Sequence, residues 1–118
     1  MDPALRPLDD ADVPTVMAHD RAVLYKHSPT CWLSGRALGE VQAFAAACPD
    51  VPVWMVDVIR QRPLSQDLAR RLEIPHASPQ VIVLQQGDPV WDASHMGVTA
   101  SALERILARL PEPAPDAG

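Results

Sequence analysis

The pattern of apolar and polar positions predicts that strands and helices alternate along the chain. The apolar run at 22–26 predicts one strand, and the mostly apolar run at 51–59 predicts another that is buried on both faces. Between them, residues 31–48 carry apolar side chains every three or four positions, which is the period of a helix with one buried face. The three segments therefore predict a β-α-β unit with parallel strands.

Two further helices are predicted in the second half of the chain. Residues 63–72 have leucines four positions apart, and Ser65 is a suitable N-cap. Residues 101–110 show a second helical pattern, which opens with Ser101 and Glu104 in the spacing of a capping box. We expect each helix to bury its apolar face.

A hairpin is predicted between these two helices. The apolar runs at 80–84 and 90–93 flank Gly87 and Asp88, a pair typical of a tight turn. The resulting order, β-α-β, α, β-β, α, indicates the α/β class, with a central mixed four-stranded sheet flanked by helices.

The same pattern predicts a single folded domain over residues 20–110. Residues 1–19 form a lead-in, extended to about residue 13, and 14–19 favour a short helix or turn. Residues 111–118 contain three prolines, which lack a backbone donor and fix φ, so a disordered tail is expected there.

Composition excludes several classes of function. The 118 residues carry a formal net charge of −5 and a sequence pI near 5.1, which argues against a nucleic-acid partner. The first residues lack the apolar core of a signal peptide, and no run approaches the roughly 20 apolar residues that span a bilayer. We therefore expect a cytoplasmic protein that binds neither nucleic acid nor membrane.

Cys31 lies where the first predicted strand gives way to the first helix. A thiolate at that turn faces the first N–H groups of the helix, whose partial positive charge favours the charged form. Ser34 occupies the position where a dithiol oxidoreductase has its second cysteine. Cys48 belongs to the apolar face of the same predicted helix. It lies about 25 Å from Cys31 along that helix, beyond the roughly 7 Å reach of a disulfide. The pattern indicates a single-thiol redox protein.

A cysteine at the first strand-to-helix turn of this element order resembles the thioredoxin fold over about residues 20–110. In that fold a cis-proline packs beside the reactive cysteine. Pro79 follows Ser78 at the matching place, 48 residues beyond Cys31. We therefore expect a cis peptide bond between Ser78 and Pro79, with the Ser78 backbone pairing with the incoming thiol or peptide.

Several short motifs sharpen the resemblance. They are Tyr25-Lys26-His27-Ser28, Thr30-Cys31, Ser34, Val56-Asp57-Val58-Ile59, Arg62-Pro63, His76-Ala77-Ser78-Pro79-Gln80 and Ala93-Ser94-His95. Together they resemble the monothiol bacilliredoxin family, the YtxJ-like proteins of the bacillithiol system. The family commonly reads Thr-Cys-Pro-Ile-Ser, whereas here Trp32 and Leu33 follow the cysteine. Trp32 keeps an N–H that proline lacks and adds a large apolar face, which affects rate and substrate preference more than reaction type.

The resemblance implies a reaction at Cys31. Its thiolate would attack a mixed disulfide between a client protein and bacillithiol, take the small thiol and release the client reduced. A second bacillithiol or another reductant would regenerate Cys31, and Ser34 would donate a hydrogen bond to the thiolate. The substrate would meet Thr30, Trp32, Ser78 and Pro79. Bacillithiol is then a co-substrate, bacillithiolated proteins are the partners, and no cofactor is permanently bound.

Other polar residues near these motifs are weaker candidates. His27 would favour the thiolate if protonated, and His76 would line the groove near Pro79. Lys26 is expected at a solvated strand end, and His95 in a turn. The four histidines and two cysteines show no close ligand spacing, so no metal site is expected.

Two alternatives remain open. One is a thioredoxin-fold binding or adaptor module in which Cys31 supports no reductase turnover. The other is an adaptor that holds an iron-sulfur cluster between two subunits, as monothiol glutaredoxins do. Against the latter, the chain lacks the Cys-Gly-Phe-Ser signature, and Trp32 is much bulkier than glycine.

Overall fold

A computed structural model describes residues 5–111 of the chain. The beginning of the expected lead-in, residues 1–4, lies outside the described residues, as does the expected disordered tail apart from Pro111.

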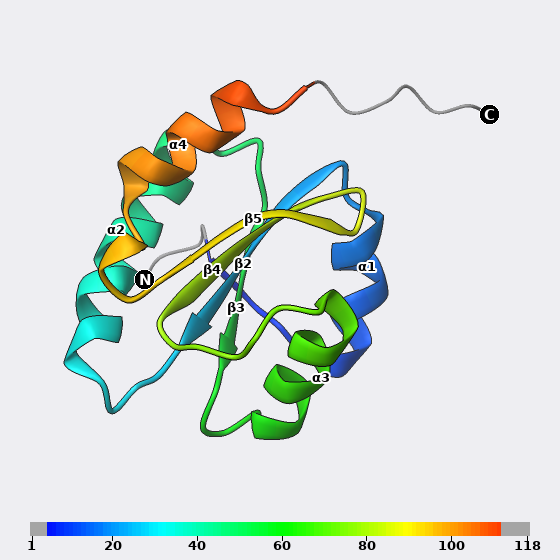
Figure 1. Cartoon of the computed structure of the whole chain (residues 1–118), viewed down its shortest axis with the longest axis vertical. Coiled ribbons are helices and arrows are strands. Elements are labelled where there is room, and N and C mark those ends of the chain that lie inside the picture. The colour runs from blue at the N-terminus through cyan, green and yellow to red at the C-terminus, as the bar shows by residue number, and fades with distance from the viewer. Residues whose placement is uncertain (1–4, 112–118) are drawn as a thin grey trace.

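A five-stranded mixed sheet forms the centre of the molecule (Figure 1), with the strand order β1-β3-β2-β4-β5. The strands are β1 (Leu5–Pro7), β2 (Arg21–His27), β3 (Val53–Asp57), β4 (Gln80–Gln85) and β5 (Asp88–Ser94). Strands β1, β3 and β2 are parallel, whereas β4 and β5 run antiparallel to their neighbours. The predicted α/β class, parallel β-α-β unit and C-terminal hairpin are confirmed.

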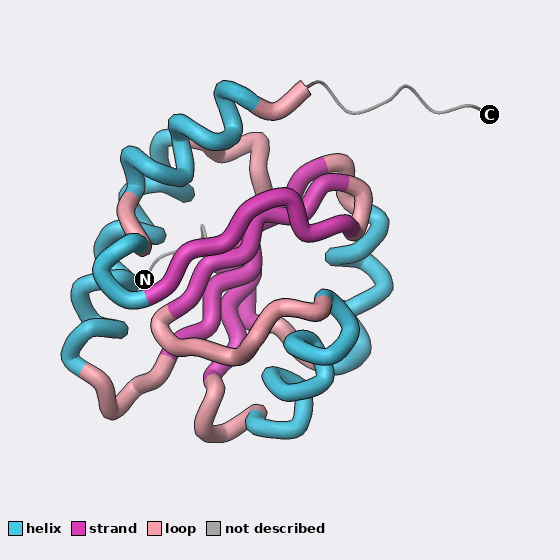
Figure 2. Tube along the Cα trace, viewed as in Figure 1, coloured by secondary structure: helices cyan, strands magenta, loops and turns pink. Residues whose placement is uncertain are grey.

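Helices cover both faces of this sheet. They are α1 (Val13–Ala18), α2 (Trp32–Ala47), α3 (Arg62–Leu72) and α4 (Ala100–Arg109), with 3-10 turns η1 (Asp10–Asp12) and η2 (His95–Gly97). Helices α2 and α4 lie on one face and α1 and α3 on the other, so that Figure 2 shows the strands between two layers of helix. No helix within residues 5–111 is long and apolar enough to cross a membrane.

Each face of the sheet has its own apolar core, and β2 contributes to both. Val23 and Tyr25 pack toward the cluster that includes Phe44 of α2, whereas Ala22 and Leu24 pack toward the cluster beneath α3. Alternate residues of a strand point to opposite faces, so a strand between two helical layers is buried throughout. Residues 22–26 of β2 are accordingly all buried.

The sheet has five strands, so the expectation of four was wrong. The additional strand, β1, comes from the lead-in and pairs only with β3, in the register Leu5 with Val53. Its three residues are too few to show a strand period, and Pro7 is tolerated because β1 is an edge strand. The Gln61 amide donates to the Leu8 carbonyl at 2.6 Å and ties this segment to the turn before α3.

Both predicted N-caps were also wrong. Ser65 lies inside α3 and is buried, because that helix begins at Arg62 after the N-cap Gln61. Helix α4 begins two residues earlier than the capping-box pattern suggested, with Thr99 as its N-cap. Thr99 has the extended backbone that a cap requires, and its Oγ1 accepts a hydrogen bond from the Ala102 N–H at 3.1 Å.

Replacing Thr99 by alanine should therefore lower the free energy of unfolding by about 1 kcal/mol, because the Ala102 N–H loses its partner. Ser101→Ala is the matched control and should change stability by less than about 0.5 kcal/mol, since Ser101 is exposed within the helix. Urea denaturation of both variants measures the difference. Equal losses would contradict the assignment of Thr99 as the cap.

Candidate active site

Cys31 is the N-cap of α2, immediately after the loop that follows β2. Its backbone is extended, with φ −107° and ψ 125°, and its carbonyl accepts hydrogen bonds from the N–H groups of Ser34 at 3.0 Å and Gly35 at 3.4 Å. The Cys31 N–H donates to the Ser28 carbonyl at 3.2 Å. The half-buried thiol therefore sits at the positive end of a 16-residue helix, as the sequence predicted.

Ser34 joins the first turn of α2 to the loop before it. Its buried Oγ accepts a hydrogen bond from the Ser28 N–H at 3.1 Å, and its carbonyl accepts one from the Tyr25 hydroxyl at 2.9 Å. The Oγ–Ser28 bond uses a lone pair and leaves the hydroxyl proton available to donate. Ser34 thus holds the Cys31 loop in place, a role that the sequence did not predict. Its predicted hydrogen bond to the thiolate stays a prediction.

Tyr25 lies beneath this loop as a protonated donor. Burial raises its pKa, and the charge of the Cys31 thiolate raises it further. Its hydroxyl also lies 2.9 Å from His27 Nδ1, and since its one proton goes to the Ser34 carbonyl, His27 is the donor in that pair. Burial lowers the pKa of His27, despite the opposing effect of Asp57, so His27 supplies no positive charge to the thiol at neutral pH.

The loop before β4 meets the loop after β2 at the same edge of the sheet. The Ser78–Pro79 peptide bond is cis, as predicted. Lys26 and Gln80 are register partners, and Ser28 and Ser78 line one cavity. The tertiary structure thus brings the cis-proline loop to the end of the strand that leads to Cys31.

Thr30 and Trp32 flank Cys31 in the sequence and are both exposed. The Trp32 side chain is 77% exposed, which is unusual for so large an apolar residue. The pattern of the sequence had placed an apolar face beside the thiol, and the structure shows this face open to solvent.

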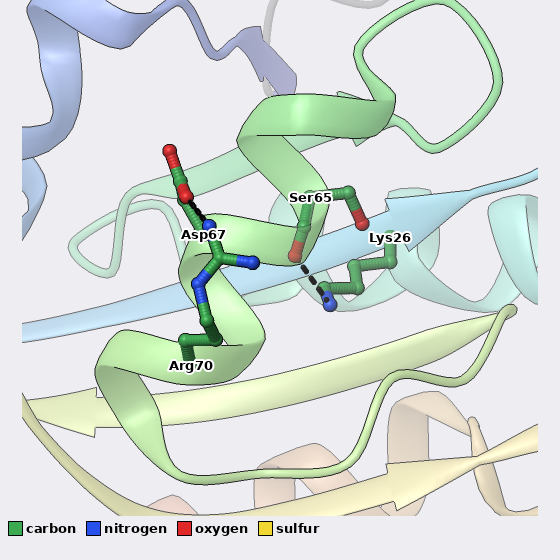
Figure 3. Close-up of polar contacts among 4 residues, drawn as sticks. All are labelled: Lys26, Ser65, Asp67 and Arg70. Atoms are coloured by element: carbon green, nitrogen blue, oxygen red, sulfur yellow. Dashed lines mark hydrogen bonds and ion pairs between the residues drawn. The ribbon is translucent and has the colours of Figure 1, made fainter.

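Lys26 was expected at a solvated strand end, and this prediction was wrong. Its side chain is fully buried rather than solvated, and its Nζ donates to the Ser65 carbonyl of α3 at 3.1 Å (Figure 3). The same Nζ lies 3.2 Å from His76 Nδ1. The signal was present in the strand period, because Lys26 shares a face of β2 with Ala22 and Leu24, both buried.

Burial lowers the pKa of Lys26 to about 8. Burial also lowers the pKa of His76, and the positive charges of Lys26 and Arg62 add to that effect. His95 has other partners: its backbone N–H donates to the Pro79 carbonyl at 2.9 Å, and its ring Nδ1 lies 3.2 Å from Ser94 Oγ. His76 is therefore the histidine that contacts Lys26 and lines the cavity beside Ser78.

Cys48 lies at the far end of α2, where it packs against the apolar core. Burial raises the pKa of its thiol, and the negative charges of Glu104 and Asp50 raise it further. The sixteen residues of α2 separate it from Cys31, which places the two residues about 25 Å apart along the helix, and both cysteines are free thiols. Cys31 therefore has no partner for a local disulfide.

Comparisons with known proteins agree with this geometry. The family model of monothiol bacilliredoxin BrxC matches residues 9–103. A solved structure of a candidate oxidoreductase with a thioredoxin fold has 25% sequence identity and a TM-score of 0.81, over 86% of this chain and 92% of that one. Mitochondrial thioredoxin 3 from Saccharomyces cerevisiae, at 20% identity, has a TM-score of 0.70 over 91% of this chain and 96% of its own.

The thioredoxin from Trypanosoma brucei brucei has a TM-score of 0.75 at 14% identity, with 92% of each chain covered. At such low identities these two thioredoxins establish the fold alone. Fold and family model together support a thiol redox role.

Lys26 makes stability depend on pH in a defined window. The unfolded chain keeps this proton to about pH 10.5, whereas the folded protein releases it near pH 8, so the folded state gains stability as pH rises between these values. Between pH 7.0 and 9.5 the wild type should gain about 2 kcal/mol of unfolding free energy relative to Lys26→Met. Urea denaturation of both proteins at both pH values measures this.

Comparing the two proteins at each pH cancels the titration of Cys48 and Tyr25, which are present in both. A difference between wild type and Lys26→Met that is constant with pH would show that Lys26 keeps its ordinary pKa.

Proposed function

The chain belongs to the monothiol bacilliredoxin family, and we propose that it removes bacillithiol from client proteins that carry it as a mixed disulfide. The observation that carries this proposal is the free Cys31 at the N-terminus of α2, with Ser34 one turn later in place of a second thiol. A thiol in this position can take part in disulfide exchange but cannot close a local disulfide.

The first step is an attack by the Cys31 thiolate on the bacillithiol sulfur of the mixed disulfide. A bond forms between Cys31 Sγ and that sulfur, the client–bacillithiol bond breaks, and the client leaves as a thiolate. The disulfide has moved to Cys31, so the client is reduced and Cys31 is oxidised. The positive end of α2 stabilises the attacking thiolate.

The second step needs an external thiol. A second bacillithiol thiolate attacks the small-thiol sulfur of the adduct, and Cys31 leaves as a thiolate while bacillithiol disulfide is released. Ser34 has no thiol to offer, and Cys48 lies at the other end of α2. Bacillithiol is therefore a co-substrate, and no permanently bound cofactor takes part.

The substrate contacts follow from where the loops lie. The Ser78 backbone, beside cis Pro79, is proposed to pair with the incoming disulfide, and exposed Thr30 and Trp32 meet the client protein. Ser34 is a positioning residue, because it ties Ser28 to α2. A reducing compartment keeps both cysteines as thiols, so we place the reaction in the cytoplasm.

Exposure to bacillithiol disulfide should add one bacillithiol mass to the purified wild-type protein, at Cys31. Intact-mass spectrometry measures the adduct, with glutathione disulfide as the comparison reagent. Cys31→Ala should form no adduct, whereas Cys48→Ala should react like the wild type, because its thiol is remote from the site and has a raised pKa.

No adduct in the wild type, or an adduct on Cys48 alone, would overturn this mechanism. A thioredoxin-fold binding module would then describe the protein better. A brown protein with iron and sulfide after anaerobic purification would instead indicate the iron-sulfur adaptor.

Ser34→Cys should convert the site to a dithiol one. The introduced thiol lies one helical turn from Cys31, where it can attack the Cys31 adduct and expel bacillithiol without an external thiol. In a time course by intact mass, the adduct should be transient and give way to a protein two mass units lighter than its reduced form. Ser34→Ala is the matched control and should retain the adduct; a stable adduct in Ser34→Cys would contradict the proposed geometry.

A further inference from the structure

A cavity of about 240 Å³ opens between the loop after β2, the start of α3 and the loop before cis Pro79. Polar side chains line much of its wall: Ser28, Arg62, Ser65, His76 and Ser78. The volume is below the roughly 300–1,000 Å³ of sites for drug-sized ligands, so it suits a small polar group or one end of a larger molecule.

This cavity adjoins the thiol site without containing Cys31. Ser28, in its wall, accepts a hydrogen bond from the Cys31 N–H and donates one to Ser34 Oγ. Ser78, also in the wall, precedes cis Pro79. A molecule joined to Cys31 by a disulfide therefore has the cavity within reach of its other end.

Positive charge gathers at this cavity without a neutralising partner. Arg62 lies in its wall. The buried Lys26 ammonium contacts two further wall residues: its Nζ donates to the Ser65 carbonyl (Figure 3) and lies 3.2 Å from His76 Nδ1. Within residues 5–111 the only ion pair joins Asp67 to Arg70, on α3 beyond the cavity. Neither Arg62 nor Lys26 has a carboxylate partner there.

Asp57 precedes the wall residue Val58 in the sequence, but its carboxylate has other partners. Its Oδ1 accepts hydrogen bonds from the N–H groups of Ile59 and Arg60, both at 2.9 Å. The hydrogen bond from the Arg60 N–H is the main cause that lowers the pKa of Asp57. This carboxylate therefore caps the turn before α3 and does not balance the charge of Lys26 and Arg62.

We propose that this cavity is a carboxylate-binding subsite for the small thiol that Cys31 accepts, with Arg62 as its principal ligand. The proposal rests on the proposed function and adds to it how the small thiol is recognised. Arg62 offers the planar donor geometry that carboxylates prefer, and Ser78, also in the wall, has a hydroxyl that can donate as well. The malate group of bacillithiol carries two carboxylates, which fits this chemistry.

Such a subsite gives the exchange reaction its direction. A carboxylate held at Arg62 anchors the small thiol rather than the client, so its sulfur is presented to Cys31 and the client sulfur becomes the leaving group. A small thiol without a carboxylate lacks this anchor. We therefore expect the subsite to make Cys31 react faster with disulfides of carboxylate-bearing thiols than with neutral disulfides.

Arg62→Gln tests the subsite, with Arg71→Gln as the matched control on the same helix. Each substitution removes one exposed positive charge, but Arg71 lies in the last turn of α3, about 14 Å along the helix from Arg62. The measured quantity is the rate of adduct formation on Cys31 with bacillithiol disulfide, divided by the rate with the neutral bis(2-hydroxyethyl) disulfide.

This ratio should fall about threefold to fivefold in Arg62→Gln and stay at the wild-type value in Arg71→Gln. Glutathione disulfide, which also carries carboxylates, serves as a third substrate and shows whether the subsite accepts any carboxylate-bearing thiol. An equal ratio in all three proteins would overturn the subsite while leaving the exchange reaction intact.

A binding measurement separates the subsite from the reaction. L-Malate titrated into Cys31→Ala, which cannot form the adduct, should shift the NMR signals of the His76 ring, and Arg62→Gln in the same background should weaken this binding. No shift would overturn the subsite. A wild type that forms no adduct while malate still binds would instead contradict the proposed function and retain the carboxylate site.

Discussion

The burial of β2 on both faces constrains the polar groups at its carboxyl end. Buried polar groups must find partners inside the protein, and Tyr25 and Lys26 point to opposite faces of the sheet. Tyr25 finds the Ser34 carbonyl of α2, and Lys26 finds the Ser65 carbonyl of α3. One pair of neighbouring residues thus links the central strand to the helix that bears the thiol and to the helix that borders the cavity.

The thiol side of this arrangement depends on backbone hydrogen bonds. Cys31 is held by its own N–H and carbonyl, and Ser34 closes the loop through the Ser28 N–H. None of these bonds involves the side chain of Trp32. Trp32 is accommodated after the cysteine because its side chain extends into solvent.

The cavity side shows that local charge differs from overall charge. The chain as a whole has a formal net charge of −5. Yet Arg62 lies in the wall of the cavity and Lys26 is buried behind that wall, and neither has an acidic partner among the described residues. Net charge describes long-range attraction, whereas recognition of a small anion depends on a few groups within hydrogen-bond distance. The acidic composition therefore says nothing against an anionic substrate.

The sequence by itself determined the α/β class and the position of Cys31 at a helix N-terminus, because apolar periods encode strands and helices locally. The cis bond before Pro79 was predicted from the resemblance to the thioredoxin fold, and the structure confirms it. It did not reveal β1, whose three residues form a strand only by pairing with β3. It also misplaced Lys26 as solvated, although the strand period put it on a buried face. Only the tertiary structure decided that Lys26, Arg62 and His76 share one region, because their segments lie far apart in the chain and meet where β2 and β4 pair and α3 packs over them.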